Sequence, residues 1–286
     1  MAKTGGRNLG DWLSAVLPGR WAAPEKMIPV VALSGPIGMA SSFQKPLSLR
    51  TVAGALERAF SFEKSPAVAL LVNSPGGSAV QSHLIHRRIR ALAEEKEKPV
   101  IAFIEDLAAS GGYMIACAAD ELYADPASVV GSIGVVSAGF GFTGLIDRIG
   151  VERRMHTAGE SKAFLDPFLP EREEDVARLE RIQSEIHGHF IELVRARRGA
   201  KLEETDDLFS GLVWAGREAE GLGLIDGLGD ARTLMRERHG DDVRLRLIEP
   251  QRPSFLRRAL FGSAAAAAEG AVSALEARAL WARHGL

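Results

Sequence analysis

The sequence contains a single cysteine, Cys117, among its 286 residues, so an internal disulfide is excluded. Cys117 lies in an apolar run and is interpreted as a small core side chain. An excess of one charge is also lacking: the formal net charge is −2, which gives no reason to expect nucleic acid as a partner. Nothing in the composition therefore demands an oxidising compartment or a polyanionic ligand.

A long uninterrupted apolar run is absent as well. Residues 126–146 are uncharged and long enough to cross a bilayer, but five glycines and four hydroxyl residues interrupt them. The N-terminus shows no apolar core followed by a small-residue cleavage site, so a secretory signal is not evident. The chain is expected to be cytoplasmic and without a transmembrane anchor, with peripheral contact at the inner membrane as an alternative.

What is present is enough apolar material for a substantial core, 46% of the residues. We divide the chain into three parts. Residues 1–27 form an amphipathic arm, expected to dock on the body, on a neighbouring subunit or on a membrane surface. Residues 28–240 form the main domain, and residues 241–286 form a C-terminal strand and an Ala-rich helical tail.

Short apolar, β-branched runs alternate with helical patterns in the first half of the main domain. Strands recurring with helical crossovers predict an α/β fold with a largely parallel sheet. A long charged helix is expected from about residue 171 to residue 198. The predicted strands cover residues 28–33, 67–72, 100–104, 121–124 and 129–136.

Two glycine-containing segments follow predicted strands. Ser110, in the sequence ASGGY at residues 109–113, opens an apolar helix, where a helix N-terminus favours developing negative charge. The alternative is that Ser110 only caps the helix. The sequence SPGGS at residues 74–78 could turn an amide toward a substrate carbonyl, or it could be an ordinary strand-to-helix turn.

Lys162, in the sequence GESK at residues 159–162, is the candidate base. An exposed lysine, with a pKa of about 10.4, is a poor base at neutral pH, whereas burial favours the neutral amine. Apolar residues at positions 163–165 and 168 suit a dry amine, although a solvated surface lysine is the alternative. Ser132 lies in a predicted buried strand and needs a hydrogen-bond partner, which the Lys162 amine or a backbone group could provide.

Together these segments resemble the signal peptide peptidase A family of serine–lysine peptidases, in its short, single-repeat form. The similarity runs from about residue 30 to residue 229 and includes NSPGGS at 73–78, ASGGY at 109–113, GSIGV at 131–135 and GESK at 159–162. The resemblance implies an α/β, ClpP/crotonase-like spiral of strand–helix units with a mostly parallel sheet and a helical C-terminal extension.

The resemblance also implies a site and its partners. Ser110 would be the nucleophile, Lys162 the base and Ser132 the hydroxyl that orients this base. No metal or organic cofactor is implied. The expected substrates are extended, largely apolar peptides such as signal-peptide remnants, and a homo-oligomeric ring or dome is expected. The backbone of three glycines would bind substrate and the oxyanion: Gly76, Gly77 and Gly111.

Alternatives remain open at this point. A Ser-His-Asp peptidase would need a histidine base, for which His156, on a predicted strand before Lys162, is the candidate. A crotonase-like acyl-CoA enzyme would hold a thioester enolate with the same glycine amides. A catalytically silent, membrane-associated scaffold would use the N-terminal arm and the tail.

Two other patterns are interpreted as structural. The sequence GFGFTG at residues 139–144 has dinucleotide-binding spacing, but we interpret it as a loop beside the substrate groove. His83 and His86 lie on a basic helix and are interpreted as a solvated face rather than a metal site.

Overall fold

A computed structural model describes residues 26–38, 46–159, 161–203 and 205–248, together with residues 278, 281, 282 and 284. The predicted N-terminal arm, apart from residues 26 and 27, and most of the predicted tail lie outside the described residues.

The centre of the molecule is an eight-stranded sheet with the order β6-β5-β3-β2-β1-β8, in which β4 also pairs with β3, and β7 with β4. The β5–β6 pairing is antiparallel and the others are parallel. The predicted α/β class with a largely parallel sheet is therefore confirmed. The strands are β1 (Met27–Ser34), β2 (Val68–Ser74), β3 (Val100–Ala109), β4 (Glu121–Ala124), β5 (Val129–Gly131), β6 (Val213–Ala215), β7 (Gly227–Leu228) and β8 (Arg244–Leu247).

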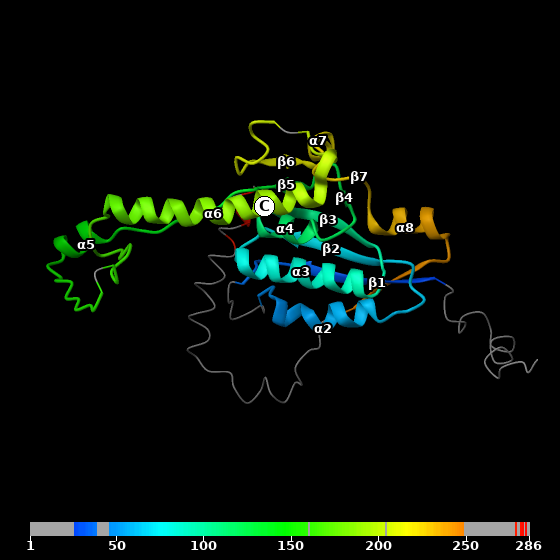
Figure 1. Cartoon of the computed structure of the whole chain (residues 1–286), viewed down its shortest axis with the longest axis horizontal. Coiled ribbons are helices and arrows are strands. Elements are labelled where there is room, and N and C mark those ends of the chain that lie inside the picture. Colours follow the sequence, from blue (N-terminus) through cyan, green and yellow to red (C-terminus); the bar gives the residue numbers. More distant parts are fainter. Residues whose placement is uncertain are drawn as a thin grey trace, which may run out of the picture.

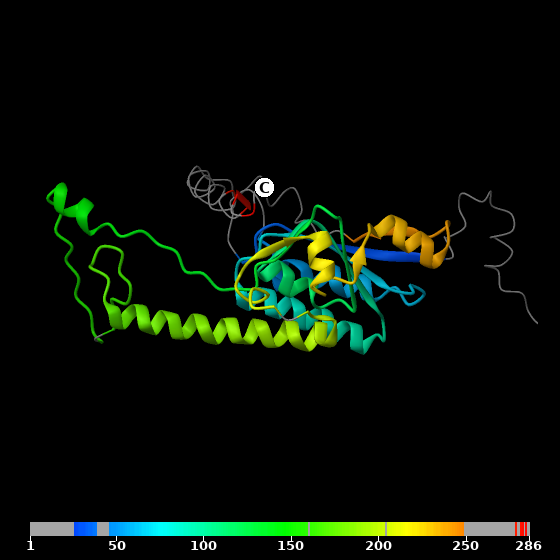
Figure 2. The same cartoon turned by 90° about the horizontal axis from the view of Figure 1, so that it is seen from above.

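Helices bury both faces of this sheet, as Figures 1 and 2 show. Alternate residues of β2 point to opposite faces: Val68 and Leu70 pack with α2, α3 and α4, whereas Ala69 packs with Met235 of α8. This two-sided burial explains why β2 and the first half of β3 are almost continuously apolar. The helices are α2 (Leu49–Phe60), α3 (Ala79–Glu95), α4 (Gly111–Ala116), α5 (Thr143–Arg148), α6 (Glu173–Arg198), α7 (Gly216–Gly221) and α8 (Ala231–His239), with a 3₁₀ turn at Gly199–Lys201.

Strand β3 changes partners along its length, and this change positions the site. Its first half pairs with β4 and its second half, from Leu107 to Ala109, pairs with β5. The carboxyl ends of β2, β3 and β5 consequently meet at one edge of the sheet, which is where open α/β sheets bind their ligands. The strand predicted at residues 129–136 ends at Gly131, because Ser132 has a φ of 53°, which is incompatible with a strand.

A long protrusion leaves the body after β5 and returns through α6. We call residues 135–159 and 161–172 the protrusion; α5 lies at its far end (Figures 1 and 2). His187 of α6 forms a hydrogen bond with Ile133 in the turn that follows β5. The part of α6 from Glu173 to His187 is about 21 Å long, so the protrusion begins about that far from this contact. The GFGFTG segment lies in this protrusion.

Candidate active site

Ser110 lies between the end of β3 and the start of α4 in a strained conformation. Its φ of 52° and ψ of −122° are rare for a residue with a side chain and cost about 1–3 kcal/mol, so neighbouring contacts must hold it. One such contact is the Ser110 amide, which donates to the Gly131 carbonyl over 2.8 Å. The half-buried side chain makes no capping hydrogen bond to α4. The geometry therefore favours a presented hydroxyl over a simple N-cap.

The glycine turn after β2 packs directly on this serine. A Cβ on Gly76 would lie 2.8 Å from both the Gly111 amide nitrogen and the Ser110 Cβ, and Gly76 has a φ of 92°. Only glycine permits so close an approach in that conformation. Buried Ser74 braces the turn: its hydroxyl donates to the Gly35 carbonyl over 2.7 Å and accepts from the Gly76 amide over 3.2 Å.

Two backbone amides near Ser110 are candidates for binding an oxyanion. Gly111 occupies the first position of α4, where an N–H group has no carbonyl partner within the helix. Ile37 pairs with the Gly76 carbonyl and the Ser78 amide, so this pairing does not use the N–H of Gly77. The donors expected from the sequence thus lie on adjoining backbone segments.

Ser132 also belongs to this cluster. Its amide donates to the Leu212 carbonyl over 2.6 Å, and the preceding residue, Gly131, accepts the hydrogen bond from Ser110. The sheet edge therefore brings together five of the six expected site residues, which are Ser110, Ser132, Gly76, Gly77 and Gly111.

Lys162 is not part of this cluster within one chain. It lies exposed in a turn of the protrusion, where its amide donates to the Gly159 carbonyl over 3.2 Å. Among the described residues no hydrogen bond joins the Lys162 side chain to Ser110 or Ser132. The alternative base, His156, is exposed in the same protrusion, and residues 151–157 have no regular secondary structure in place of the expected strand.

The protrusion nevertheless has a defined internal structure. Phe142 and Phe168 stack with their ring centroids 5.4 Å apart, and Arg153 forms an ion pair with Asp166 over 2.7 Å. Large apolar side chains remain on its outside, including Phe140, which is 81% exposed. Several exposed apolar side chains on one segment make the protrusion a candidate interaction surface. The others in this group are Val136, Leu145, Ile149, Val151 and Leu169.

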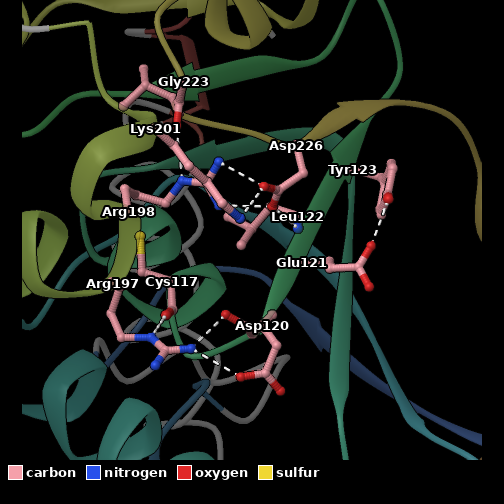
Figure 3. A network of polar contacts seen from close by, with 12 residues as sticks. Cys117, Asp120, Glu121, Leu122, Tyr123, Arg197, Arg198, Lys201, Gly223 and Asp226 are labelled. Carbon is pink, nitrogen blue, oxygen red and sulfur yellow. Dashed lines mark hydrogen bonds and ion pairs between the residues drawn. The ribbon is translucent and has the colours of Figure 1, made fainter.

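A buried ionic network fixes the other end of α6 to the body (Figure 3). The Arg198 guanidinium donates to both carboxylate oxygens of Asp226, over 2.7 and 3.2 Å, and Lys201 donates to the same carboxylate over 2.6 Å. Burial raises the pKa of Asp226, but the two cations and the Leu122 amide outweigh it and hold this pKa below its usual range. Local sequence patterns do not indicate this network, because residues far apart in the chain form it.

Histidines join α6 to α3 near the base of the protrusion. His83 and His189 lie 2.9 Å apart between ring nitrogens, while His86 is only 7% exposed and neither of its ring nitrogens has a hydrogen-bond partner among the described residues. The expectation of a solvated face is therefore wrong for His86. Burial, and then the positive charge of Arg197, lower the pKa of His86 to about 4; the nearby Cys117 carbonyl opposes this weakly but accepts from Arg197 instead.

His86 predicts a loss of stability in acid. The pKa of His86 is lower in the folded protein than in the unfolded chain. The free energy of unfolding is therefore at its full value above about pH 6.5 and falls by about 3 kcal/mol as the pH drops toward 4. Urea unfolding from pH 7.5 to pH 4.5 should show this loss in the wild type and a smaller one in His86→Leu. Equal pH dependence in both proteins would contradict the assignment.

The described part of the chain contains no group of three or more histidine, cysteine, aspartate or glutamate residues arranged to hold a metal ion. In the same ranges, no helix combines the length and apolar character needed to cross a membrane.

Comparison with known proteins places this arrangement in a family. Residues 92–243, which include Ser110, Ser132 and Lys162, match the model of peptidase family S49. The chain belongs to peptidase family S49. This membership supports peptidase activity and agrees with the serine–lysine family resemblance in the sequence.

Individual relatives extend the match. A Haemophilus influenzae protein named protease 4 is 36% identical over 77% of this chain and 35% of its own length. The chloroplastic serine protease SPPA of Arabidopsis thaliana is 33% identical over 67% of the chain and 29% of its own length. A Brucella abortus protein named Na(+)/H(+) antiporter NhaA is 53% identical over 96% of the chain. The chain spans only 39% of the length of that relative.

Among solved structures, a 1510-N membrane-bound stomatin-specific protease in complex with a substrate peptide covers 83% of the chain. Its sequence identity is 16% and its TM-score is 0.49.

Proposed function

We propose that the chain is a serine endopeptidase in which Ser110 attacks the scissile carbonyl and Lys162 takes its proton. The observation that carries the proposal is the strained backbone of Ser110, whose side chain makes no capping hydrogen bond. Ser110 lies between Gly76 and Gly111 at the carboxyl edge of the sheet. A merely structural serine gains nothing from that conformation, whereas a nucleophile is held toward the substrate by it.

The chemistry follows from the proposed roles. The neutral Lys162 amine removes the proton as the Ser110 oxygen bonds to the carbonyl carbon, and the amides of Gly77 and Gly111 stabilise the oxyanion. Lys162, now protonated, gives the proton to the leaving amine, and an acyl-enzyme remains. The neutral amine then takes a proton from a water molecule as the water oxygen bonds to the acyl carbon, and it returns this proton to the Ser110 oxygen when the acyl bond breaks. Ser132 orients the amine in both steps.

We propose further that two protomers complete each site. Lys162 is exposed in the protrusion, whereas Ser110 lies on the body, and the outside of the protrusion carries exposed apolar side chains. Assembly into a ring or dome would cover those side chains and could bring Lys162 of one protomer to Ser110 of the next. Burial in that contact would favour the neutral amine that a base requires.

The substrate proposal is an extended, largely apolar peptide such as a signal-peptide remnant. Extended peptides pair with exposed strand edges through their backbones, and the antiparallel edge strand β6 lies next to the Ser132 turn. Peripheral contact with the inner membrane, within the cytoplasm, is the setting that suits such substrates.

The test is covalent labelling with a fluorophosphonate probe, read by peptide mass spectrometry from pH 6 to pH 10. The wild type should carry the label on Ser110, and both Ser110→Ala and Lys162→Ala should lose it. Lys96→Ala, a change at another exposed lysine, is the matched control and should label like the wild type. A lysine base predicts labelling that keeps rising in alkali.

Other outcomes separate the alternatives. Label that survives in Lys162→Ala and levels off above about pH 7 would contradict the lysine base and indicate a histidine such as His156. A wild type that never labels would contradict the peptidase proposal.

A further inference from the structure

His187 makes a side-chain contact with the turn that carries Ser132. Its Nε2 lies 3.0 Å from the carbonyl oxygen of Ile133, the residue directly after Ser132. A carbonyl oxygen can only accept, so Nε2 carries the hydrogen and donates. The contact joins residues that are 54 positions apart in the chain, from α6 to the turn after β5.

The turn requires support of this kind. Ser132 has a φ of 53°, a left-handed conformation that a residue with a side chain adopts only where its surroundings enforce it. Successive backbone groups are held in place: the Gly131 carbonyl accepts from Ser110, the Ser132 amide donates to Leu212, and the Ser132 carbonyl accepts from Gly134. The carbonyl of Ile133 is held by His187.

The same contact closes the base of the protrusion. Ile133 lies where the chain leaves the body, and His187 lies on α6, through which the chain returns (Figure 2). A hydrogen bond between the outgoing and returning segments fixes the direction in which the protrusion, and with it Lys162, leaves the body. The ionic network of Figure 3 fixes only the C-terminal end of the same helix.

We infer that His187 is a positioning residue of the proposed peptidase, which holds the Ser132 turn and the base of the protrusion in the geometry needed for proton transfer. The inference rests on the proposed function. His187 acts through the Ile133 carbonyl and touches neither substrate nor reacting atoms.

The test compares three variants by peptidase kinetics and by the rate and endpoint of fluorophosphonate labelling. His187→Ala removes the donor, and we expect kcat and the labelling rate to fall about tenfold, with KM and the labelling endpoint near the wild-type values. His187→Gln retains an N–H donor and should keep most of the wild-type kcat. His189→Ala removes the hydrogen bond to His83 from the same helix without touching the Ser132 turn, and it should leave kcat unchanged.

Each contrary result has a distinct meaning. If the wild type is active and His187→Ala matches it, the inference is overturned but the proposed function is not. The same holds if His187→Gln is as slow as His187→Ala. A lower labelling endpoint in His187→Ala, accompanied by an earlier thermal unfolding transition, would also overturn it, because the histidine would then act only on stability. A wild type with neither labelling nor peptidase activity would contradict the proposed function itself.

Discussion

Ser110→Ala and Lys162→Ala are each expected to be inactive alone and to regain activity when they assemble together. Either change should lower kcat on the order of 10⁵-fold, because nucleophile and base act as one unit. If each site takes its serine from one protomer and its lysine from the next, randomly mixed rings should have about a quarter of their sites intact. The recovery of peptidase activity from nearly zero to about a quarter of the wild-type value is the largest effect that we expect.

The experiment requires assemblies that contain both variants. Co-expression with two different affinity tags, followed by purification on each tag in turn, selects mixed assemblies, and light scattering gives their size. The control is Ser110→Ala carrying both tags, which should stay inactive. Mixed assemblies that remain inactive, or a wild-type monomer that cleaves peptides, would exclude a site shared between protomers.

Asp226→Asn is expected to lower the free energy of unfolding by about 3–5 kcal/mol, because it leaves a buried cation without its partner. The side chain of Arg198 is 2% exposed and that of Asp226 is 12% exposed, so water cannot solvate the guanidinium that has lost its carboxylate partner. The effect should reach α6 as a whole, since Arg198 is its last residue. Urea unfolding at pH 7.5 measures the change directly.

A matched control is available at another Asp–Arg pair. Asp241 pairs with Arg236 over 2.9 Å, but its side chain is 91% exposed. Asp241→Asn should therefore change the free energy of unfolding by less than about 0.5 kcal/mol. If the two asparagine variants unfold alike, the buried network does not anchor α6 in the way we describe.

Local patterns predicted much of this fold correctly. Short apolar runs indicated the positions of β1 to β4, but the run predicted at residues 100–104 covers only the first half of β3, which continues through Glu105 and Asp106. The charged periodic segment near residues 171–198 indicated α6, whose acidic first turn and basic last turn complement the helix dipole. The strand predicted through residue 136 was too long, since apolar composition cannot signal the left-handed φ of Ser132.

The sequence by itself determined the class of the protein. The serine and the glycine turns are local motifs, and each lies at the end of a strand, so a candidate site can be proposed from a few adjacent residues. The arrangement of the site depended on tertiary structure. The partner change of β3 brings three strand ends together, the buried Arg198–Asp226 pair holds α6, and the protrusion carries Lys162 away from Ser110. These features depend on contacts between residues distant in the chain, which composition and spacing do not encode.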